Sequence, residues 1–163
     1  MARLGWTLGA VAGSLAGGAV VSALMLAQER ASRKPAELTT LQRATAQRMG
    51  RRTLPPTAPY LPTPEEQATA HGGHMLLSAA AGVAYAAAFD EDAPLVLSGL
   101  GFGEAFYALA HGVLKPILST EDPEWRQPPP AIAQHLLVHA VFGLFIAAGA
   151  KLGAALDRRA LAP

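Results

Sequence analysis

Four long stretches with almost no charge alternate along the chain with segments that carry most of its ionisable side chains. Residues 4–27 and 72–89 contain no Asp, Glu, Lys or Arg, and residues 94–118 and 131–156 contain only three between them. Charged residues make up 15% of the chain, whereas an average soluble domain has about 25%. At about 1.5 Å per residue, helices of these lengths approach or exceed the 30 Å of a bilayer core. We therefore predict an all-α, integral membrane four-helix bundle, because an open sheet cannot satisfy its edges in lipid.

A polar, proline-rich linker at residues 28–71 separates the first two predicted spans. Pro35 is expected to end or interrupt the first helix, because proline lacks the backbone N–H that a helix interior needs. Residues 36–49 fit a short basic helix, either solvated or lying on the membrane surface. Its less polar residues fall near one face of that helix, and Arg43 falls elsewhere. The residues of this face are Leu38, Leu41, Thr45 and Met49. The prolines of residues 54–64 then predict an extended connector.

Composition narrows the class of protein further. The net charge of +1 gives no electrostatic footprint for nucleic acid, so the expected partner is the lipid bilayer. The absence of cysteine excludes disulfides, thiolate metal sites and cysteine nucleophiles. The sequence contains no phosphate-binding loop, dinucleotide fingerprint or nucleophile elbow, which disfavours an enzyme without excluding one. A cleaved signal peptide is the alternative for residues 4–27, although its apolar core of about 7–15 residues would be shorter.

Glycines recur every fourth residue along three of the predicted spans, in the GxxxG pattern. Missing side chains allow two helix backbones to approach closely in a membrane. The pattern predicts tight helix contacts, either within the bundle or with a second copy or another subunit of a membrane complex. The residues concerned are Gly5, Gly9, Gly13 and Gly17, then Gly99 and Gly103, then Gly149 and Gly153.

All five histidines are expected near one face of the membrane. His71 and His74 begin the second span, His111 lies late in the third, and His135 and His139 lie early in the fourth. Antiparallel threading places these three helix ends on the same side. Spacings of three, four and seven residues keep the polar residues of each span on one helical face. The sequence thus predicts a histidine-lined polar site.

Glu104 lies near the middle of the third span. An ionised carboxylate facing lipid there would cost several kcal/mol, so we expect Glu104 to face the bundle. We expect it to be protonated or paired, with His139 or a buried water as its partner.

Three interpretations of the polar cluster are open. His74, His111 and His139, with His135 or Glu104, suit a transition metal such as zinc, because imidazole is a common ligand. The same groups also suit a path or sensor for protons or a solute, because histidine titrates near neutral pH. In the third interpretation they only hydrogen-bond between helices and fix the bundle. The alternative function is that of a structural or accessory subunit that packs through its glycine strips.

From residue 72 onward the chain resembles the YagU-like family of bacterial inner-membrane proteins. The matching pieces are His74-x3-Ser78 with Tyr85, Gly99-x3-Gly103 followed by His111 and Pro116, and His139 before Arg158-Arg159. The resemblance implies a multi-pass inner-membrane protein with a link to acid tolerance and no assigned reaction. It also singles out His74, His111 and His139 as the functional core. Glu104, His71 and His135 lie outside the matching pattern.

Positive charge predicts membrane orientation, because Lys and Arg accumulate on the cytoplasmic side. The histidine side carries nine of these residues and the opposite side carries four, which favours cytoplasmic histidines. The resemblance favours the opposite orientation, with a cytoplasmic C-terminus. The two signals therefore leave both orientations open.

Overall fold

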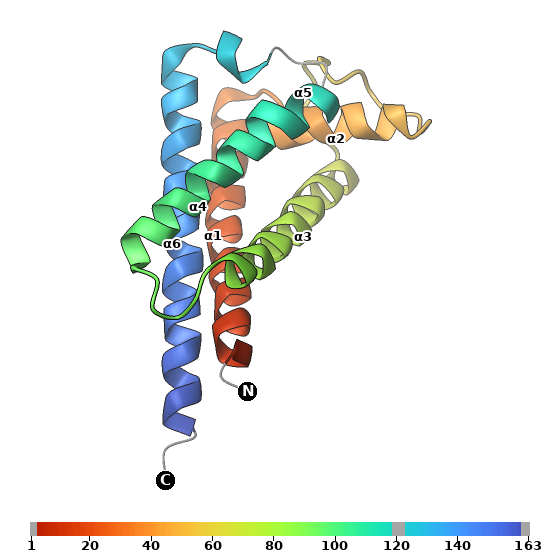
Figure 1. Ribbon diagram of the computed structural model, residues 1–163. Coiled ribbons are helices and arrows are strands. Elements are labelled where there is room, and N and C mark those ends of the chain that lie inside the picture. The colour runs from red at the N-terminus through yellow and green to blue at the C-terminus, as the bar shows by residue number, and fades with distance from the viewer. Residues whose placement is uncertain (1–2, 119–122, 161–163) are drawn as a thin grey trace.

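The computed structural model describes residues 3–118 and 123–160, and these residues form helices and connectors without a strand (Figure 1). The five longer helices are α1 (Arg3–Ser32), α2 (Glu37–Arg48), α3 (Pro64–Ala88), α4 (Leu95–Leu109) and α6 (Pro129–Ala160). A π-helical turn, η1 (Ala110–Leu114), joins α4 to α5 (Lys115–Leu118), and a 3-10 turn, η2 (Glu124–Arg126), precedes α6. The prediction of an all-helical chain is confirmed for the described residues.

The predicted spans all fall on helices, with shifted boundaries. The first helix ends at Ser32, shortly before Pro35, and the third predicted span corresponds to α4, η1 and α5 together. Helix α3 begins at Pro64, well before residue 72, because Thr63 caps it. The Thr63 side chain accepts from the Glu66 backbone N–H while the Glu66 carboxylate accepts from the Thr63 backbone N–H. Such a reciprocal capping box satisfies two backbone donors and lets the helix start inside a polar segment.

Helices α1 and α6 form the central antiparallel pair, with both ends of the described chain at the same end of the molecule (Figure 1). Their contact follows the glycine strips. A methyl group at Gly9 would overlap the Gly149 carbonyl oxygen, and one at Gly5 would overlap Gly153. The glycines therefore bring the two backbones together within one chain, as close helix packing requires. A contact with a second copy of the chain would have to use a surface other than these glycines of α1 and α6.

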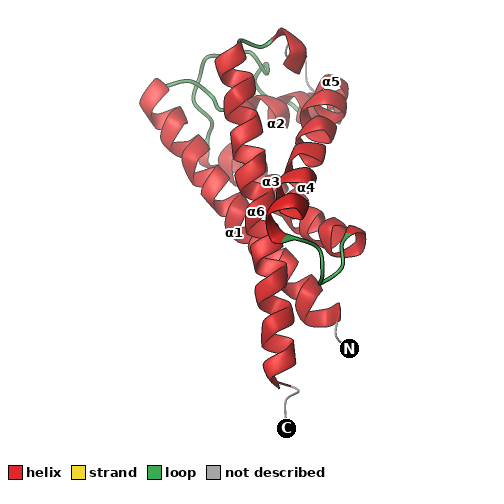
Figure 2. Cartoon of the chain, turned by 60° about the vertical axis from the view of Figure 1, so that its left-hand side comes forward, coloured by secondary structure: helices red, strands yellow, loops and turns green. Residues whose placement is uncertain are grey.

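Helix α3 packs against α1, and α4 packs against α6 (Figure 2). On α4, Gly99 and Gly103 lie against the α6 backbone at Gly143 and His139. The predicted close contact of this strip is thus also made inside the bundle. Gly17 departs from the pattern, because it faces the Phe142 and Phe145 side chains rather than another glycine.

Small side chains fill much of the interior, whereas many large aliphatic side chains lie outside. Ala10, Ala81, Ala147 and Ala150 are buried, together with an aromatic group that includes Trp6 and Tyr85. Two of the described helices, α1 from Leu4 onward and α6, are long and apolar enough to cross a membrane.

Helix α2 confirms the predicted short helix, but not its orientation. Arg43, which the sequence places away from the apolar face, is fully buried, whereas Met49 just beyond α2 is 68% exposed. The Arg43 guanidinium donates to both carboxylate oxygens of Glu66, at 2.9 and 3.2 Å, and to the carbonyls of Ala58 and Tyr60. Because a buried guanidinium needs a full set of acceptors, these bonds fix α2 to α3 and to the proline-rich connector.

Candidate functional site

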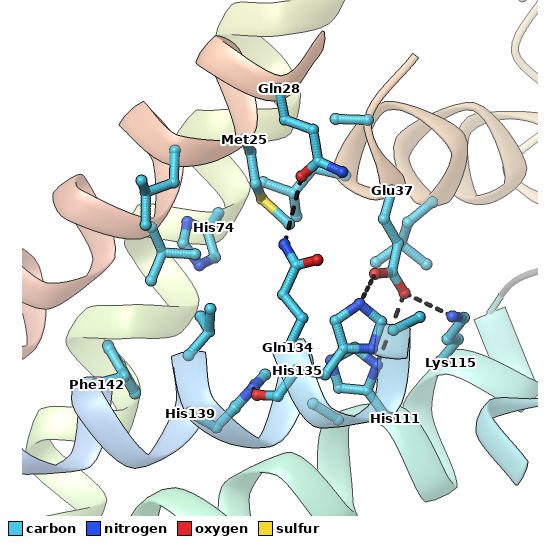
Figure 3. Close-up of a pocket in the computed structure, with 18 of the residues that line it drawn as sticks. Met25, Gln28, Glu37, His74, His111, Lys115, Gln134, His135, His139 and Phe142 are labelled. Atoms are coloured by element: carbon cyan, nitrogen blue, oxygen red, sulfur yellow. Dashed lines mark hydrogen bonds and ion pairs between the residues drawn. The ribbon is translucent and has the colours of Figure 1, made fainter. Parts of the chain in front are cut away.

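A cavity of about 770 Å³ lies at the α2 end of the bundle (Figure 3). Helices α1, α2, α3, α4 and α6 all contribute to its wall, with η1 and α5. Four of the five histidines line it, namely His74, His111, His135 and His139. The structure thus brings together at one end the histidines that antiparallel threading predicts there. His71 is not part of the wall.

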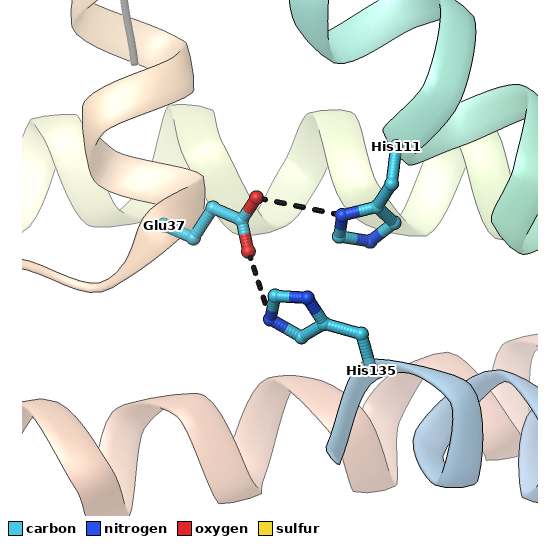
Figure 4. A group of neighbouring side chains, drawn as sticks. All are labelled: Glu37, His111 and His135. Atoms are coloured by element: carbon cyan, nitrogen blue, oxygen red, sulfur yellow. Dashed lines mark ion pairs between the residues drawn. The ribbon is translucent and has the colours of Figure 1, made fainter. Parts of the chain in front are cut away.

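Glu37 on α2 faces the imidazoles of His111 and His135 from one side (Figure 4). Its Oε1 is 3.7 Å from Nδ1 of His111, and its Oε2 is 3.4 Å from Nε2 of His135. One ligand atom from each of the three residues falls within 4.8 Å of the other two. Zinc bonds of about 2.0–2.2 Å in a tetrahedron separate the ligand atoms by about 3.3 Å. Small side-chain adjustments would therefore suffice for the three to hold one ion.

Glu124 in η2 lies on the other side of the same imidazoles. Its Oε1 is 2.7 Å from Nδ1 of His135, and its Oε2 is 3.2 Å from Nδ1 of His111. The Tyr107 hydroxyl donates to the same carboxylate at 3.3 Å. Burial by itself raises the pKa of Glu124, but the hydrogen bond and charge of His135, with the charges of His111 and Lys115, bring it below the ordinary value. This carboxyl group therefore acts as an ionised acceptor.

Lys115 is the cation of the cluster. Its Nζ lies 2.7 Å from Oε1 of Glu37 and 3.5 Å from Oε2 of Glu124, and the residue is buried. An ammonium group with its charge compensated in this way can remain in a poorly hydrated site. The two carboxylates and the ammonium leave one net negative charge when the imidazoles are neutral. A proton or a metal ion would offset that charge.

The π-helical turn η1 positions His111 in this cluster. A π turn closes i→i+5 hydrogen bonds and widens the helix locally, and such turns are frequent at functional sites. His111 lies within η1, and Lys115 follows directly after it. Both residues reach Glu37, so the distorted segment directs two polar side chains toward α2.

His139 and His74 occupy the less polar part of the wall. His139 Nδ1 lies 2.8 Å from the His135 carbonyl oxygen, so it is the donor. A neutral ring then carries its lone pair on Nε2. His74 Nδ1 is 3.0 Å from the Ser22 hydroxyl on α1. These two histidines therefore lie beside the carboxylate cluster without belonging to it.

Glu104, the expected intramembrane carboxylate, is half-buried and does not line the cavity. It makes no hydrogen bond or ion pair with any residue in the described ranges, including the expected partner His139. The two carboxylates that the structure does place at the histidines are Glu37 and Glu124. Sequence reasoning missed both, because they lie in polar connectors where a solvated role is the ordinary expectation. The only sequence signal that could have identified them is their position, because both connectors lie at the end of the molecule where the histidines are predicted to gather.

Comparison with known proteins adds no assignment. No protein-family model, no curated protein and no solved structure matches the chain. A role for the cavity therefore follows from its own chemistry.

Proposed function

We propose that the chain is a four-span protein of the bacterial inner membrane that binds a divalent transition metal, such as zinc, at the α2 end of its bundle. The spans lie within α1, within α3 from about residue 72 onward, within the α4–η1–α5 segment and within α6. The resemblance to the YagU-like family, which implies the same membrane placement, supports the proposal. The convergence of Glu37, His111 and His135 carries the metal assignment.

Membrane placement of all four helices is supported by the distribution of large apolar side chains. Each helix has at least one leucine that is more than half exposed: Leu4 on α1 at 63%, Leu76 on α3 at 76%, Leu97 on α4 at 72% and Leu137 on α6 at 65%. Large exposed apolar patches are unfavourable in water and mark membrane or interaction surfaces. An interior of alanine and glycine with leucine outside is the arrangement expected where lipid is the solvent.

Single cysteines test the number of spans, because the native chain contains none. Met49→Cys and Asp92→Cys each place a single cysteine at an exposed position. With four spans they lie on opposite sides of the membrane, so an impermeant maleimide labels only one of them in intact inverted or right-side-out vesicles. With only α1 and α6 in the membrane, both would be labelled from the same side, and the four-span proposal would fail. A phosphatase reporter after Pro163 gives the absolute orientation.

The metal assignment rests on the chemistry and orientation of three ligands. Two imidazoles and one carboxylate form a common zinc donor set. Glu124 accepts from Nδ1 of His135, which leaves Nε2 of the neutral ring with its lone pair toward Glu37. Carboxylates that orient a ligating histidine in this way are a regular part of zinc sites. His111 would supply Nδ1, which lies 3.7 Å from Oε1 of Glu37, and this nitrogen would exchange its 3.2 Å contact with Glu124 for the metal.

The test is metal analysis of protein purified in detergent and loaded with zinc. One equivalent of zinc is expected for the native chain, with binding lost in Glu37→Gln and in His135→Ala. His71→Ala is the matched control, because His71 lies outside the cavity wall. Absence of stoichiometric zinc from the native protein, or equal binding in all three variants, would rule the site out.

Proton sensing or conduction is the second candidate, and Lys115 favours it. Its ammonium already contacts Glu37 and Glu124, and protonation of one imidazole would make the cluster neutral without any metal. Histidine titrates near physiological pH. Proton flux into liposomes, measured with zinc removed, distinguishes this function from metal binding. Flux that depends on His111 and His135 supports it, and flux equal to that of empty liposomes excludes conduction.

A further inference from the structure

The cavity is much larger than an ion requires. Its volume of about 770 Å³ lies in the 300–1,000 Å³ range of small-molecule sites. Most of the wall beyond the carboxylate cluster is apolar, with contributions from α1, α2, α3, α4 and α6. Representative residues are Leu24, Leu41, Leu77, Phe106, Val138 and Phe142. The space is therefore polar at one end and apolar over the rest of its length.

The charged side chains of the wall are already engaged by other groups of the chain or by solvent. Glu37 is paired with Lys115 at 2.7 Å. Glu29, which is buried, accepts from the Ala36 N–H, the Thr39 hydroxyl and the Gln67 amide at 2.8 to 3.2 Å. Lys34 also lines the cavity but is exposed, so solvent and salt screen its charge. A ligand with an anionic head would thus lack a buried counter-charge, and the buried Glu29 carboxylate already has three donors.

Uncharged hydrogen-bonding groups are available where the polar and apolar parts of the wall meet. His139 donates through Nδ1 to a backbone carbonyl, so Nε2 of the neutral ring is an acceptor. Gln134 donates to Gln28 at 3.5 Å, a long bond that a ligand hydroxyl could replace. These groups lie on the cavity wall in Figure 3 and are distinct from the three proposed metal ligands.

We infer that the cavity binds one amphipathic molecule with an uncharged, hydroxyl-bearing head and a single apolar tail. The head lies against His139 and Gln134, and the tail lies against Leu77, Val138 and Phe142. Monoacylglycerols and the reduced forms of isoprenoid quinones both present this chemistry. The site shares the cavity with the proposed metal site but does not depend on it, because none of these wall residues is a proposed metal ligand.

Photo-labelling of the full chain in phosphatidylcholine nanodiscs tests the inference. The probe is dodecanoyl glycerol with a diazirine in its tail, and the competitors are unlabelled dodecanoyl glycerol, decyl-quinol and dodecanoate. Tail contact with outer surfaces gives labelling that competitors do not remove. We expect a saturable component of one molecule per chain on the cavity-lining peptides of α3 and α6. Neutral competitors should remove it, and dodecanoate should compete at least about tenfold less well, because its head is ionised.

Two tryptophan substitutions on α6 give a matched pair. Val138→Trp fills the cavity and should abolish the saturable labelling, whereas Leu137→Trp, on the exposed face, should leave it unchanged. Thermal unfolding in detergent shows whether Val138→Trp is folded, and Ala110→Leu fills the same cavity from η1 as a second variant. Labelling that is nowhere saturable, or that survives in both cavity variants, overturns the inference. Equal competition by dodecanoate overturns the assignment of a neutral head. If only dodecanoyl glycerol or only decyl-quinol competes, that result shows whether the ligand is a monoacylglycerol or a reduced quinone. Zinc-free protein that still binds the probe separates this inference from the metal proposal.

Discussion

The Nζ of Lys115 lies 2.7 Å from Oε1 of Glu37, in an ion pair that joins α5 to α2 at the centre of the candidate site. His111 Nδ1 also approaches this oxygen, at 3.7 Å. The ammonium group therefore occupies space and neutralises charge at the carboxylate that the proposed metal would use. In a site with limited water, two cations so close together repel each other strongly.

Replacing Lys115 with methionine is expected to strengthen metal binding. The substitution keeps most of the side-chain volume and removes the competing charge, so zinc affinity should rise about tenfold or more. Lys151→Met is the control, because Lys151 donates to the Glu91 carbonyl at the opposite end of the bundle. Competition with a zinc chelator measures both. Weaker binding in Lys115→Met than in Lys151→Met would contradict the proposed competition.

Glu124→Gln is expected to weaken zinc binding without removing a ligand. Glu124 holds Nδ1 of His135 at 2.7 Å, and loss of such an orienting carboxylate typically costs about 10–100-fold in affinity. The absorption spectrum of the cobalt-substituted protein should keep its coordination pattern while the affinity falls. Glu91→Gln, at the far end, provides the control. A changed coordination spectrum would instead make Glu124 a ligand.

Gly9→Ala is expected to destabilise the fold. The added methyl group would overlap the Gly149 carbonyl oxygen, and overpacking of this kind costs about 1–3 kcal/mol. Gly101→Ala on α4 is the matched control, because nothing lies within 4 Å of its hypothetical methyl group. There the gain in helix propensity should leave stability unchanged or slightly higher. Thermal unfolding in detergent reports both effects, and equal midpoints for the two variants would show that the α1–α6 contact is not tight.

Acid should loosen α2 from the bundle through the Arg43–Glu66 pair. The hydrogen bond from Arg43 holds the pKa of Glu66 below its ordinary value of 4.5, against burial, which raises it. A carboxyl group whose pKa is lower in the folded state stabilises that state above its unfolded pKa. It loses the contribution as the pH falls through its folded-state pKa. Hydrogen exchange of α2 should therefore accelerate below about pH 4.5.

Glu66→Gln should remove most of this acid dependence and make α2 exchange faster at neutral pH. Glu65→Gln is the control, since Glu65 is an exposed neighbour on the same helix. If exchange of α2 in Glu66→Gln kept the acid dependence of the native chain, another group would have to be responsible.

Much of the helical framework could be predicted from the sequence, because its determinants are local. Long uncharged stretches predict helices wherever they occur, and Pro35 and the prolines near Pro64 mark helix boundaries. Glycines at a spacing of four predict close contact, and those of α1 and α6 meet as expected. The side of the molecule on which the histidines gather also followed from antiparallel threading.

The composition of the site could not be predicted from the sequence, because it depends on where the connecting segments pack against the helices. Glu37 and Glu124 reach His111 and His135 only because α2 folds back over the bundle end and η2 lies beside it. The burial of Arg43 had the same origin, since its partner Glu66 and two of its carbonyl acceptors lie beyond the end of α2. Sequence periodicity places a residue on a face of its own helix, but only tertiary packing determines which distant group faces it. The sequence by itself therefore determined the helices and the end of the bundle at which the histidines lie. Only the tertiary structure decided which charged side chains contact those histidines.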